Sequence, residues 1–247
     1  MLIRLLLLLS LLFSLNTAFA GVAGTFLVVA GDVKIIAADG TTRIPQRKDT
    51  LNEGETLVTG KDGTAQLKMA DNGLLAVRPA TRFTVDAFVY KGSADGTERS
   101  FISLLRGGFR ALTGVIGKLH PENYRITTPL ATIGIRGTDH EPFHIPPPAP
   151  GEQAVGKPGT YDKVNSGSVV LKTEVGEVLV QAGQAAYAGA ANAPPQVLPT
   201  VPDFYRTSAA PAASAIPSTL PNATSPPALS TPIITPGLDS GGSHHIP

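Results

Sequence analysis

The stretch Ile126–His144, ITTPLATIGIRGTDHEPFH, decides between two fold classes for this chain of 247 residues. It ends in His140-Glu141-Pro142-Phe143-His144, which matches the H-E-x-x-H pattern of zinc peptidases. That pattern brings two imidazoles to one zinc only when it lies on a helix. The residues before it have the short apolar runs and turn residues that are typical of strands.

Pro142 decides against the helix. A proline at this position removes a backbone donor, clashes with the preceding turn and disfavours the α region for Glu141, and three more prolines follow at 146–148. In an extended chain His140 and His144 lie roughly 13 Å apart, too far to share a zinc whose bonds are about 2 Å long. We interpret both histidines as ordinary strand or loop residues. A sharp bend at Pro142 leaves open a weak metal site, or a metal-dependent hydrolase that uses His140, Glu141 and His144.

The N-terminus has the pattern of a secretory signal peptide over residues 1–20. Arg4 supplies the positive charge, Leu5–Leu15 is the apolar run, and Ala18-Phe19-Ala20 fits a cleavage site. The apolar run is short for a bilayer span of about 20 residues. We therefore predict a mature chain that begins at Gly21, lies in the periplasm or is secreted, and keeps no stable membrane anchor.

The charge balance and the missing cysteines narrow the function further. The chain has 20 basic and 19 acidic side chains, and loss of Arg4 with the signal leaves equal numbers. A neutral chain lacks the basic surface that nucleic-acid binding requires, so we expect no nucleic-acid partner. The chain has no cysteine, which excludes disulfides, thiol catalysis and zinc-thiolate sites. No cofactor is predicted.

A change of composition at Ala193 divides the mature chain. Residues 193–247 are rich in Pro, Ala, Ser and Thr and contain few charges. Such a segment buries too little apolar surface to offset its loss of conformational entropy. We predict a disordered tail, which serves either as a passive extension or as a spacer that recruits a partner.

Residues 21–192 are long enough for one domain with a sizeable core. Short apolar or alternating runs recur about every ten residues, separated by Gly, Asp, Asn and Pro, which is typical of an all-β sandwich, barrel or solenoid. The predicted strands are Phe26–Val29, Val33–Ile36, Glu55–Thr59, Thr64–Met69, Leu74–Val77, Arg82–Tyr90, Phe101–Leu105, Phe109–Leu112, Tyr124–Thr127, Ala131–Ile135, Thr160–Val164, Ser168–Thr173, Glu177–Gln181 and Ala185–Ala188. The fold class is therefore all-β, a single domain of many short antiparallel or solenoid-like strands. Only Ser103–Leu119 could also form a short helix.

Six motifs in a fixed order resemble those of the FecR-type periplasmic domain. They are Gly31-Asp32-Val33, Leu51–Gly63, Thr64–Leu75, Leu104–Gly108, Tyr124–Thr138 and Asn165–Gln184. None is specific alone, and their order from Gly31 to about Tyr187 carries the resemblance. It implies a non-enzymatic β-rich domain that transmits or receives information through protein contacts. The best-known members carry a cytoplasmic anti-sigma segment and a transmembrane helix, where this chain has the predicted signal peptide, so we do not expect it to control a sigma factor directly.

The Thr-Pro to Arg-Gly-Thr unit of these motifs suggests a structural corner that could also contact a partner. Its residues are Pro129, Gly134, Arg136, Gly137 and Thr138. We expect Pro129 to end the preceding strand, the glycines to allow a bend, and Arg136 to brace the corner against backbone carbonyls or against Asp139 or Glu141. The Pro-rich insertion His144–Gly159 is the best prediction for a variable binding surface.

The sequence thus predicts an exported, non-catalytic domain for protein interaction or envelope sensing. Its partner is an envelope protein or a cell-wall component that the sequence does not identify. A carbohydrate or peptidoglycan binding module is the alternative, and the hydrolase on His140, Glu141 and His144 is less favoured.

Overall fold

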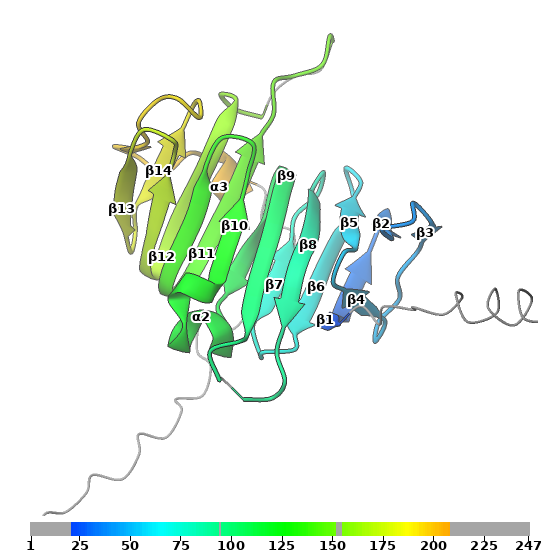
Figure 1. Ribbon diagram of the computed structural model, residues 1–247. Coiled ribbons are helices and arrows are strands. Elements are labelled where there is room, and N and C mark those ends of the chain that lie inside the picture. The colour runs from blue at the N-terminus through cyan, green and yellow to red at the C-terminus, as the bar shows by residue number, and fades with distance from the viewer. Residues whose placement is uncertain (1–20, 94, 152–154, 208–247) are drawn as a thin grey trace, which may run out of the picture. The chain divides into compact units, whose positions relative to one another are not determined.

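The structure is a computed structural model that describes residues 21–93, 95–151 and 155–207. In this part of the chain, fifteen strands form one sheet, antiparallel except where β10 runs parallel to β9 (Figure 1). The predicted all-β fold with many short strands is confirmed. The predicted signal peptide at 1–20, and the tail from residue 208 onward, lie outside the described residues.

The sheet folds over on itself into two layers, because three long strands each take part in both. These strands are β9 (Arg99–Leu112), β11 (Thr132–Ile145) and β12 (Gly159–Lys172). The first layer contains one part of each long strand. Its other strands are β13 (Glu177–Gln181), β10 (Tyr124–Thr127), β8 (Arg82–Val89), β5 (Thr56–Thr59), β2 (Val33–Ile36) and β3 (Thr42–Arg43).

The second layer is built from the remaining parts of the three long strands. Its other members are β15 (Gln196–Val197), β14 (Ala185–Ala188), β7 (Leu74–Val77), β6 (Thr64–Met69), β1 (Val22–Ala30) and β4 (Thr50–Asn52). Three short helices complete the described residues, namely α2 (Val115–Leu119), the 3-10 helix η1 (Pro121–Asn123) and α3 (Phe204–Thr207).

Each long strand passes between the layers at a glycine with positive φ. The φ angles are 70° at Gly107 in β9, 54° at Gly137 in β11 and 78° at Gly167 in β12. The register of β11 with β12 is also irregular on both sides of Asp139. A Cβ at Gly167 would lie 2.3 Å from the carbonyl oxygen of Gly137, so only glycine allows these two corners to meet.

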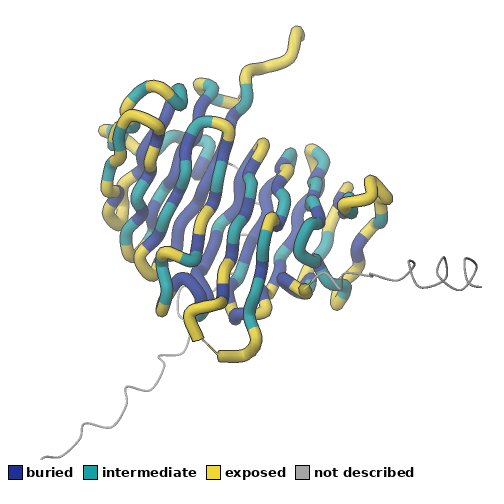
Figure 2. Tube along the Cα trace, viewed as in Figure 1, coloured by how far each residue is buried: buried dark blue, intermediate teal, exposed yellow. Residues whose placement is uncertain are grey.

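The core lies between the two layers. Alternation along β6 shows how it forms, because Ala65 and Leu67 are fully buried whereas Lys68 is exposed. Inward residues of both layers form one cluster, in which Phe83 of the first layer and Phe109 of the second have ring centroids 5.3 Å apart. Figure 2 shows buried positions recurring along every long strand.

Six predicted strands have the boundaries that the structure shows: Val33–Ile36, Thr64–Met69, Leu74–Val77, Tyr124–Thr127, Glu177–Gln181 and Ala185–Ala188. The predicted breaks at Arg106–Gly108 and at Asn165–Gly167 were wrong, because the glycines there bend one continuous strand. The predicted end at Ile135 was also wrong, since β11 continues to Ile145. The ambiguous stretch Ser103–Leu119 is strand to Leu112, followed by helix α2.

The packed structure also continues beyond Ala193, where the sequence analysis placed the start of the tail. Strand β15 pairs with β14, and Tyr205 of α3 is buried against the second layer. Local composition missed these elements because the stabilising contacts are with distant residues. Of the helices formed by described residues, none has the length and hydropathy needed to cross a membrane.

Candidate functional site

Both faces are covered along the second half of β11 and the first half of β12. All residues from Thr138 to Ile145 are buried. Alternation sends His140 and His144 toward the first layer, and sends Glu141 and Phe143 toward the opposite, outer face of the second layer. The H-E-x-x-H letters are therefore divided between two environments.

The inner face carries a histidine paired with a carboxyl group. Nδ1 of His140 lies 2.8 Å from Oδ2 of Asp162, and its Nε2 lies 3.4 Å from the hydroxyl of Tyr124. Burial raises the pKa of Asp162, against the opposing effect of His140. Nδ1 of His144 lies 3.0 Å from the hydroxyl of Thr160, and burial lowers the pKa of His144. Each histidine thus has its own partner inside the protein.

This geometry does not form the zinc site that the H-E-x-x-H letters suggest. Glu141, which would serve as the base, lies on the other face of the strand from both histidines. In the stretches of chain that the structure describes, no group of three or more His, Cys, Asp or Glu side chains is placed to hold a metal. Pro142 is accommodated within the strand, opposite Asp162.

The outer face carries a network of charged and amide side chains that we call the ionic ladder. Its members are Arg78, Arg110, Asp139, Glu141, Lys163 and Asn165. Glu141 pairs with the buried Arg78 and, at 2.8 Å, with the ammonium group of Lys163. Arg110 donates to both carboxylate oxygens of Asp139 at 2.8 and 2.5 Å. The amide of Asn165 joins the two carboxylates by donating to each at 3.1 Å.

The ionic ladder favours the charged forms of Glu141 and Arg110. Burial opposes the ionisation of Glu141, but the hydrogen bond from Lys163 and the charge of Arg78 outweigh it, so the pKa of Glu141 is lowered. The hydrogen bond to Asp139 raises the pKa of Arg110. The two faces of the β11–β12 pair therefore have opposite effects on carboxyl groups, since the pKa of Asp162 of β12, on the inner face, is raised.

An aromatic cluster continues the outer face beyond the ionic ladder. It consists of Phe143, Tyr161, Tyr187, Phe204 and Tyr205. Phe204 and Tyr205 come from the segment 198–207, which we call the C-terminal strap and which crosses this face. The hydroxyl of Tyr205 donates to the carbonyl of Glu141 at 2.9 Å. Burial raises the pKa of Tyr205 well above its usual range, so this donor stays protonated.

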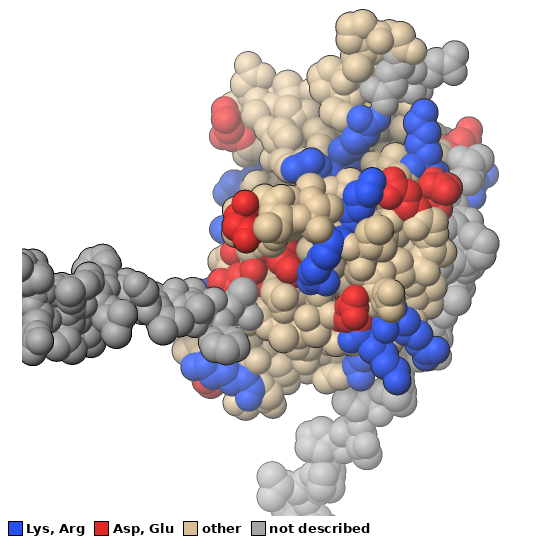
Figure 3. Space-filling model, turned by 90° about the vertical axis from the view of Figure 1, so that its right-hand side faces the viewer, with Lys and Arg blue, Asp and Glu red and all other residues tan. Residues whose placement is uncertain are grey.

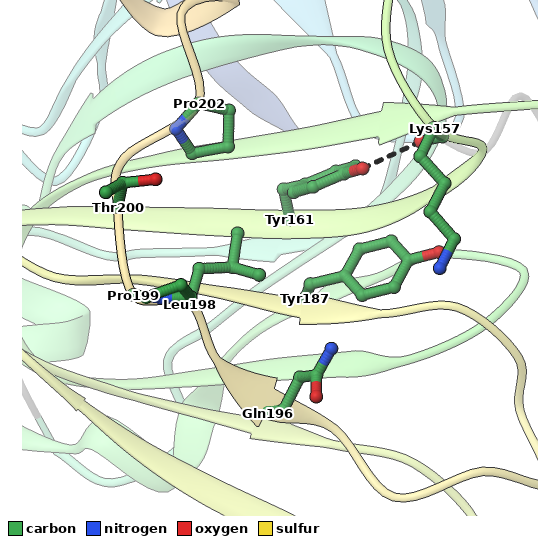
Figure 4. Close-up of a pocket in the computed structure, with 8 residues that line it drawn as sticks. All are labelled: Lys157, Tyr161, Tyr187, Gln196, Leu198, Pro199, Thr200 and Pro202. Atoms are coloured by element: carbon green, nitrogen blue, oxygen red, sulfur yellow. Dashed lines mark hydrogen bonds between the residues drawn. The ribbon is translucent and has the colours of Figure 1, made fainter.

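A hollow of about 320 Å³ lies between the strap and the strands. Its lining residues are Lys157, Tyr161, Tyr187, Gln196, Leu198, Pro199, Thr200 and Pro202. Figure 4 shows the two tyrosine rings side by side, with Lys157 at one end and strap residues at the other. The tyrosine hydroxyls donate to the carbonyls of Lys157 at 2.7 Å and of Pro158 at 2.8 Å, so they anchor the loop after β11. Burial raises the pKa of Tyr161 to about 12.

The residues proposed for the Thr-Pro to Arg-Gly-Thr corner do not gather at one place. Pro129 is exposed in the turn between β10 and β11, and Gly134 lies within β11, where an added Cβ would meet no atom within 4 Å. Gly137 lies at the crossing between the layers. Thr138 bonds to Thr113 at the end of β9 through backbone and hydroxyl groups.

Arg136 is exposed, and across the described ranges its side chain has no hydrogen bond or ion pair. Its two suggested acidic partners bond elsewhere, Asp139 to Arg110 and Glu141 to Arg78 and Lys163. The bracing role proposed for Arg136 is therefore performed by other cations.

Sequence reasoning missed the ionic ladder and the strap. The alternation of Asp139 and Glu141 with His140, and of Tyr161, Lys163 and Asn165 with Asp162, is a signal for two unlike strand faces. Phe204-Tyr205 is a second signal, because adjacent aromatic residues are unusual inside a Pro-rich segment. Arg78 follows a strand and has no local pattern that would identify it.

Charges elsewhere on the surface are mixed. Figure 3 shows basic and acidic side chains interspersed on the face at the β2, β3 and β4 end of the sheet. The hollow differs, because its lining includes the basic Lys157 and no acidic side chain.

The fold and site define an all-β domain of two layers, whose second layer has a polar and aromatic outer face under a C-terminal strap. The family model described as FecR protein matches residues 55–144, so the chain contains a FecR domain over these residues. The match is narrower than the predicted Gly31 to Tyr187. It begins at β5 and ends within β11, and leaves out the hollow and the strap.

The solved structures with some likeness to this chain are distant. Two crystal structures of a candidate anti-sigma factor from Parabacteroides distasonis align at 10% identity, with TM-scores of 0.43 and 0.42. The alignments cover 61% and 60% of this chain and 62% and 61% of the other, so the chain spans less than two thirds of that protein. A structure described as a cell surface anchoring domain aligns at 21% identity with a TM-score of 0.24, covering 25% of this chain and 82% of that one. No curated protein sequence matches this chain.

Proposed function

We propose that this protein is an exported, non-catalytic domain that senses or transmits signals in the cell envelope by binding another protein. The observation that carries the proposal is the FecR domain at residues 55–144, since this family acts in signalling and sensing. FecR domains are typically periplasmic, which agrees with the signal peptide expected at residues 1–20.

The geometry of the site supports binding more than catalysis. The groups that could act as acids or bases are engaged inside the protein, His140 with Asp162 and Glu141 with Arg78 and Lys163. The aromatic cluster and the hollow instead combine aromatic rings with the exposed cation of Lys157, which suits recognition of a protein segment.

Photo-crosslinking in the native cells tests this function. A photoreactive amino acid replaces Lys157, which lines the hollow, and in a matched control it replaces Lys61, an exposed lysine of the loop between β5 and β6. We expect one envelope protein to be captured from position 157 and not from position 61. Capture of the same proteins from both positions contradicts a specific site.

The same experiment separates the alternative function. The side-by-side rings of Tyr161 and Tyr187 could also pack against a sugar, which favours a carbohydrate or peptidoglycan module as the second candidate. Adducts at position 157 with cell-wall fragments, together with retention of the purified protein on cell wall, would replace the first proposal with this one.

A further inference from the structure

The C-terminal strap is attached to the body of the protein through its two aromatic side chains and the apolar side chains of Leu198 and Val201. Its first residue is tied by the sheet, where the N–H of Leu198 donates to the carbonyl of Ala185 at 2.8 Å. Farther along, the N–H groups of Tyr205 and Arg206 bond to Pro202 and Asp203 within the strap itself. The strap is therefore a short segment that could leave the surface without breaking the sheet.

The surface under Phe204 and Tyr205 offers two adjacent binding positions. The ring of Phe204 has its centroid 4.9 Å from that of Phe143 and 5.2 Å from that of Tyr161. The ring of Tyr205 has the guanidinium of Arg78 and the ammonium of Lys163 each 5.8 Å from its centroid. Its hydroxyl also donates to the carbonyl of Glu141. The position of Phe204 thus binds an aromatic ring between other aromatic rings, and the adjacent position of Tyr205 binds a phenol ring close to two cations.

The strap does not fill the groove that it crosses. The hollow of about 320 Å³ remains between its residues 198–202 and the rings of Tyr161 and Tyr187. The amine of Lys157 lies 4.9 Å from the centroid of the Tyr187 ring at the edge of this space. Because the lining has a cation and no acidic side chain, the empty part suits an acidic group beside an apolar one.

We propose that this groove is a binding site for an extended segment of a partner protein that carries two adjacent aromatic residues with an acidic residue beside them. The strap is then an internal pseudo-ligand for the two aromatic positions, which Phe204 and Tyr205 fill, while the position beside Lys157 stays empty because Asp203 does not line the hollow. This inference rests on the proposed function, because it assigns that function its surface and its kind of partner. The groove opens when the strap is displaced, so strap and partner exclude each other.

Peptide binding to the full chain tests the groove directly. The probe is a fluorescent peptide of residues 196–206, and the control peptide has alanine in place of both aromatic residues. We compare the unchanged protein with the Phe204→Ala/Tyr205→Ala double variant, which empties both positions, and with Phe101→Ala as a matched change at a half-buried position of β9 outside the site. A closed strap reduces apparent affinity by the fraction of molecules that are open, so we expect the double variant to bind the probe about tenfold more tightly or better.

The Tyr205→Phe variant keeps the result interpretable if the double variant does not fold. It removes only the hydroxyl bond to Glu141 and retains the ring, so it loosens the strap with little loss of packing. We expect it to bind the probe more tightly than the unchanged protein does, while Phe101→Ala does not.

The inference is overturned if variants that are folded by near-ultraviolet circular dichroism bind the probe no better than the unchanged protein. Equal binding of the alanine control peptide overturns it as well. Failure of the proposed function has a different signature, because then position 157 captures no protein in cells whether or not the purified groove binds the peptide.

Discussion

The two faces of strand β11, which continue onto its neighbour β12, place carboxyl groups in opposite electrostatic environments. On the inner face, Asp162 forms a hydrogen bond with His140, and burial raises the pKa of Asp162 because it disfavours the charged carboxylate. On the outer face, Glu141 is surrounded by Arg78, Lys163 and Asn165, and its pKa is lowered. Both carboxyl groups are buried, so burial alone does not decide whether a charge is favoured.

The difference arises from the number of hydrogen-bonding cations within reach. The outer face receives cations from three different strand regions, whereas the inner face meets the first layer, which is mostly apolar. An amide substitution removes the charge and keeps nearly the same shape. Its cost therefore measures how far each face depends on the charge.

The largest expected effect is that of Glu141→Gln. It leaves the buried guanidinium of Arg78 without its carboxylate, and breaking one side of a buried ion pair costs about 3 kcal/mol of unfolding free energy. The measurement is urea denaturation at pH 7. The matched control is Glu177→Gln, whose ion pair with Lys172 is exposed and contributes little. A loss as small as the control's contradicts the dependence of the outer face on charge.

The pH dependence of stability, compared between the unchanged protein and Glu141→Gln, shows whether the charge of Glu141 stabilises the fold. The pKa of Glu141 is lowered on folding, so its charge stabilises the protein at any pH above its pKa in the unfolded chain. This stabilisation is lost as the pH falls through the pKa that Glu141 has in the folded protein. The unchanged protein should therefore approach the stability of Glu141→Gln in acid.

Gly167→Ala should produce the next largest effect, because the corner determines which face each residue of β11 and β12 takes. An added Cβ meets the carbonyl oxygen of Gly137 at 2.3 Å, and φ is 78°, so we expect a loss of about 2 kcal/mol. Gly134→Ala is the control, since nothing lies within 4 Å of the added Cβ and φ is not positive. Equal stability of the two variants contradicts the requirement for glycine at the crossing.

Hairpin strands were predictable from the sequence, and the long strands were not. Thr64–Met69 alternates polar and apolar residues, Leu74–Val77 is a short apolar run, and Asn72-Gly73 lies between them, so local pattern is enough. At Gly107 and Gly167 the same residue type bends a strand from one layer into the other. A glycine that ends a strand and a glycine that bends one look alike in the sequence, because the difference lies in which strands pair on either side.

The site was less predictable than the fold. The extended conformation at Pro142 was predicted, and it separates Glu141 from His140 and His144 as alternation requires. The partners of Glu141 come from positions 78, 163 and 165, far apart in the sequence, and no local pattern indicates them. The strap was hidden by its Pro-rich composition, since its stability depends on contacts with Phe143 and Tyr161.

A smaller effect is expected for the pH dependence that His144 contributes on the inner face. Burial lowers its pKa from 6.5, so below that pH the unfolded chain binds a proton that the folded protein does not. Stability then falls as pH drops from about 6.5 toward the folded value, by up to about 1.4 kcal/mol per pH unit. Comparison of unfolding at pH 7.5 and 5.5 for the unchanged protein and His144→Gln isolates this contribution. The same slope in both proteins contradicts the assignment.

The smallest effect is expected for Asp162→Asn, which is the inner counterpart of Glu141→Gln. Because burial raises the pKa of Asp162, the folded protein disfavours its charge, and removing that charge relieves a cost. The asparagine carbonyl can still accept a hydrogen bond from Nδ1 of His140. The new amide group takes the place of Oδ1, which has no hydrogen-bond partner among the described residues, so its buried N–H groups are left unpaired at a cost in stability. These two changes oppose each other, so we expect a net change below about 1 kcal/mol at pH 7.

The pH dependence of Asp162→Asn provides the sharper test. An aspartate whose pKa is raised on folding destabilises the protein as pH rises through that window, so protonation in mild acid restores stability to the unchanged protein. Relative to the unchanged protein, Asp162→Asn should thus become less stable as pH falls from 7 toward 3.8, the ordinary pKa of an aspartate. Glu141→Gln should move in the opposite direction as pH falls below 4.5, because there the unchanged protein loses its charge. If both variants move in the same direction, the two faces of β11 do not differ in the way that their contacts indicate.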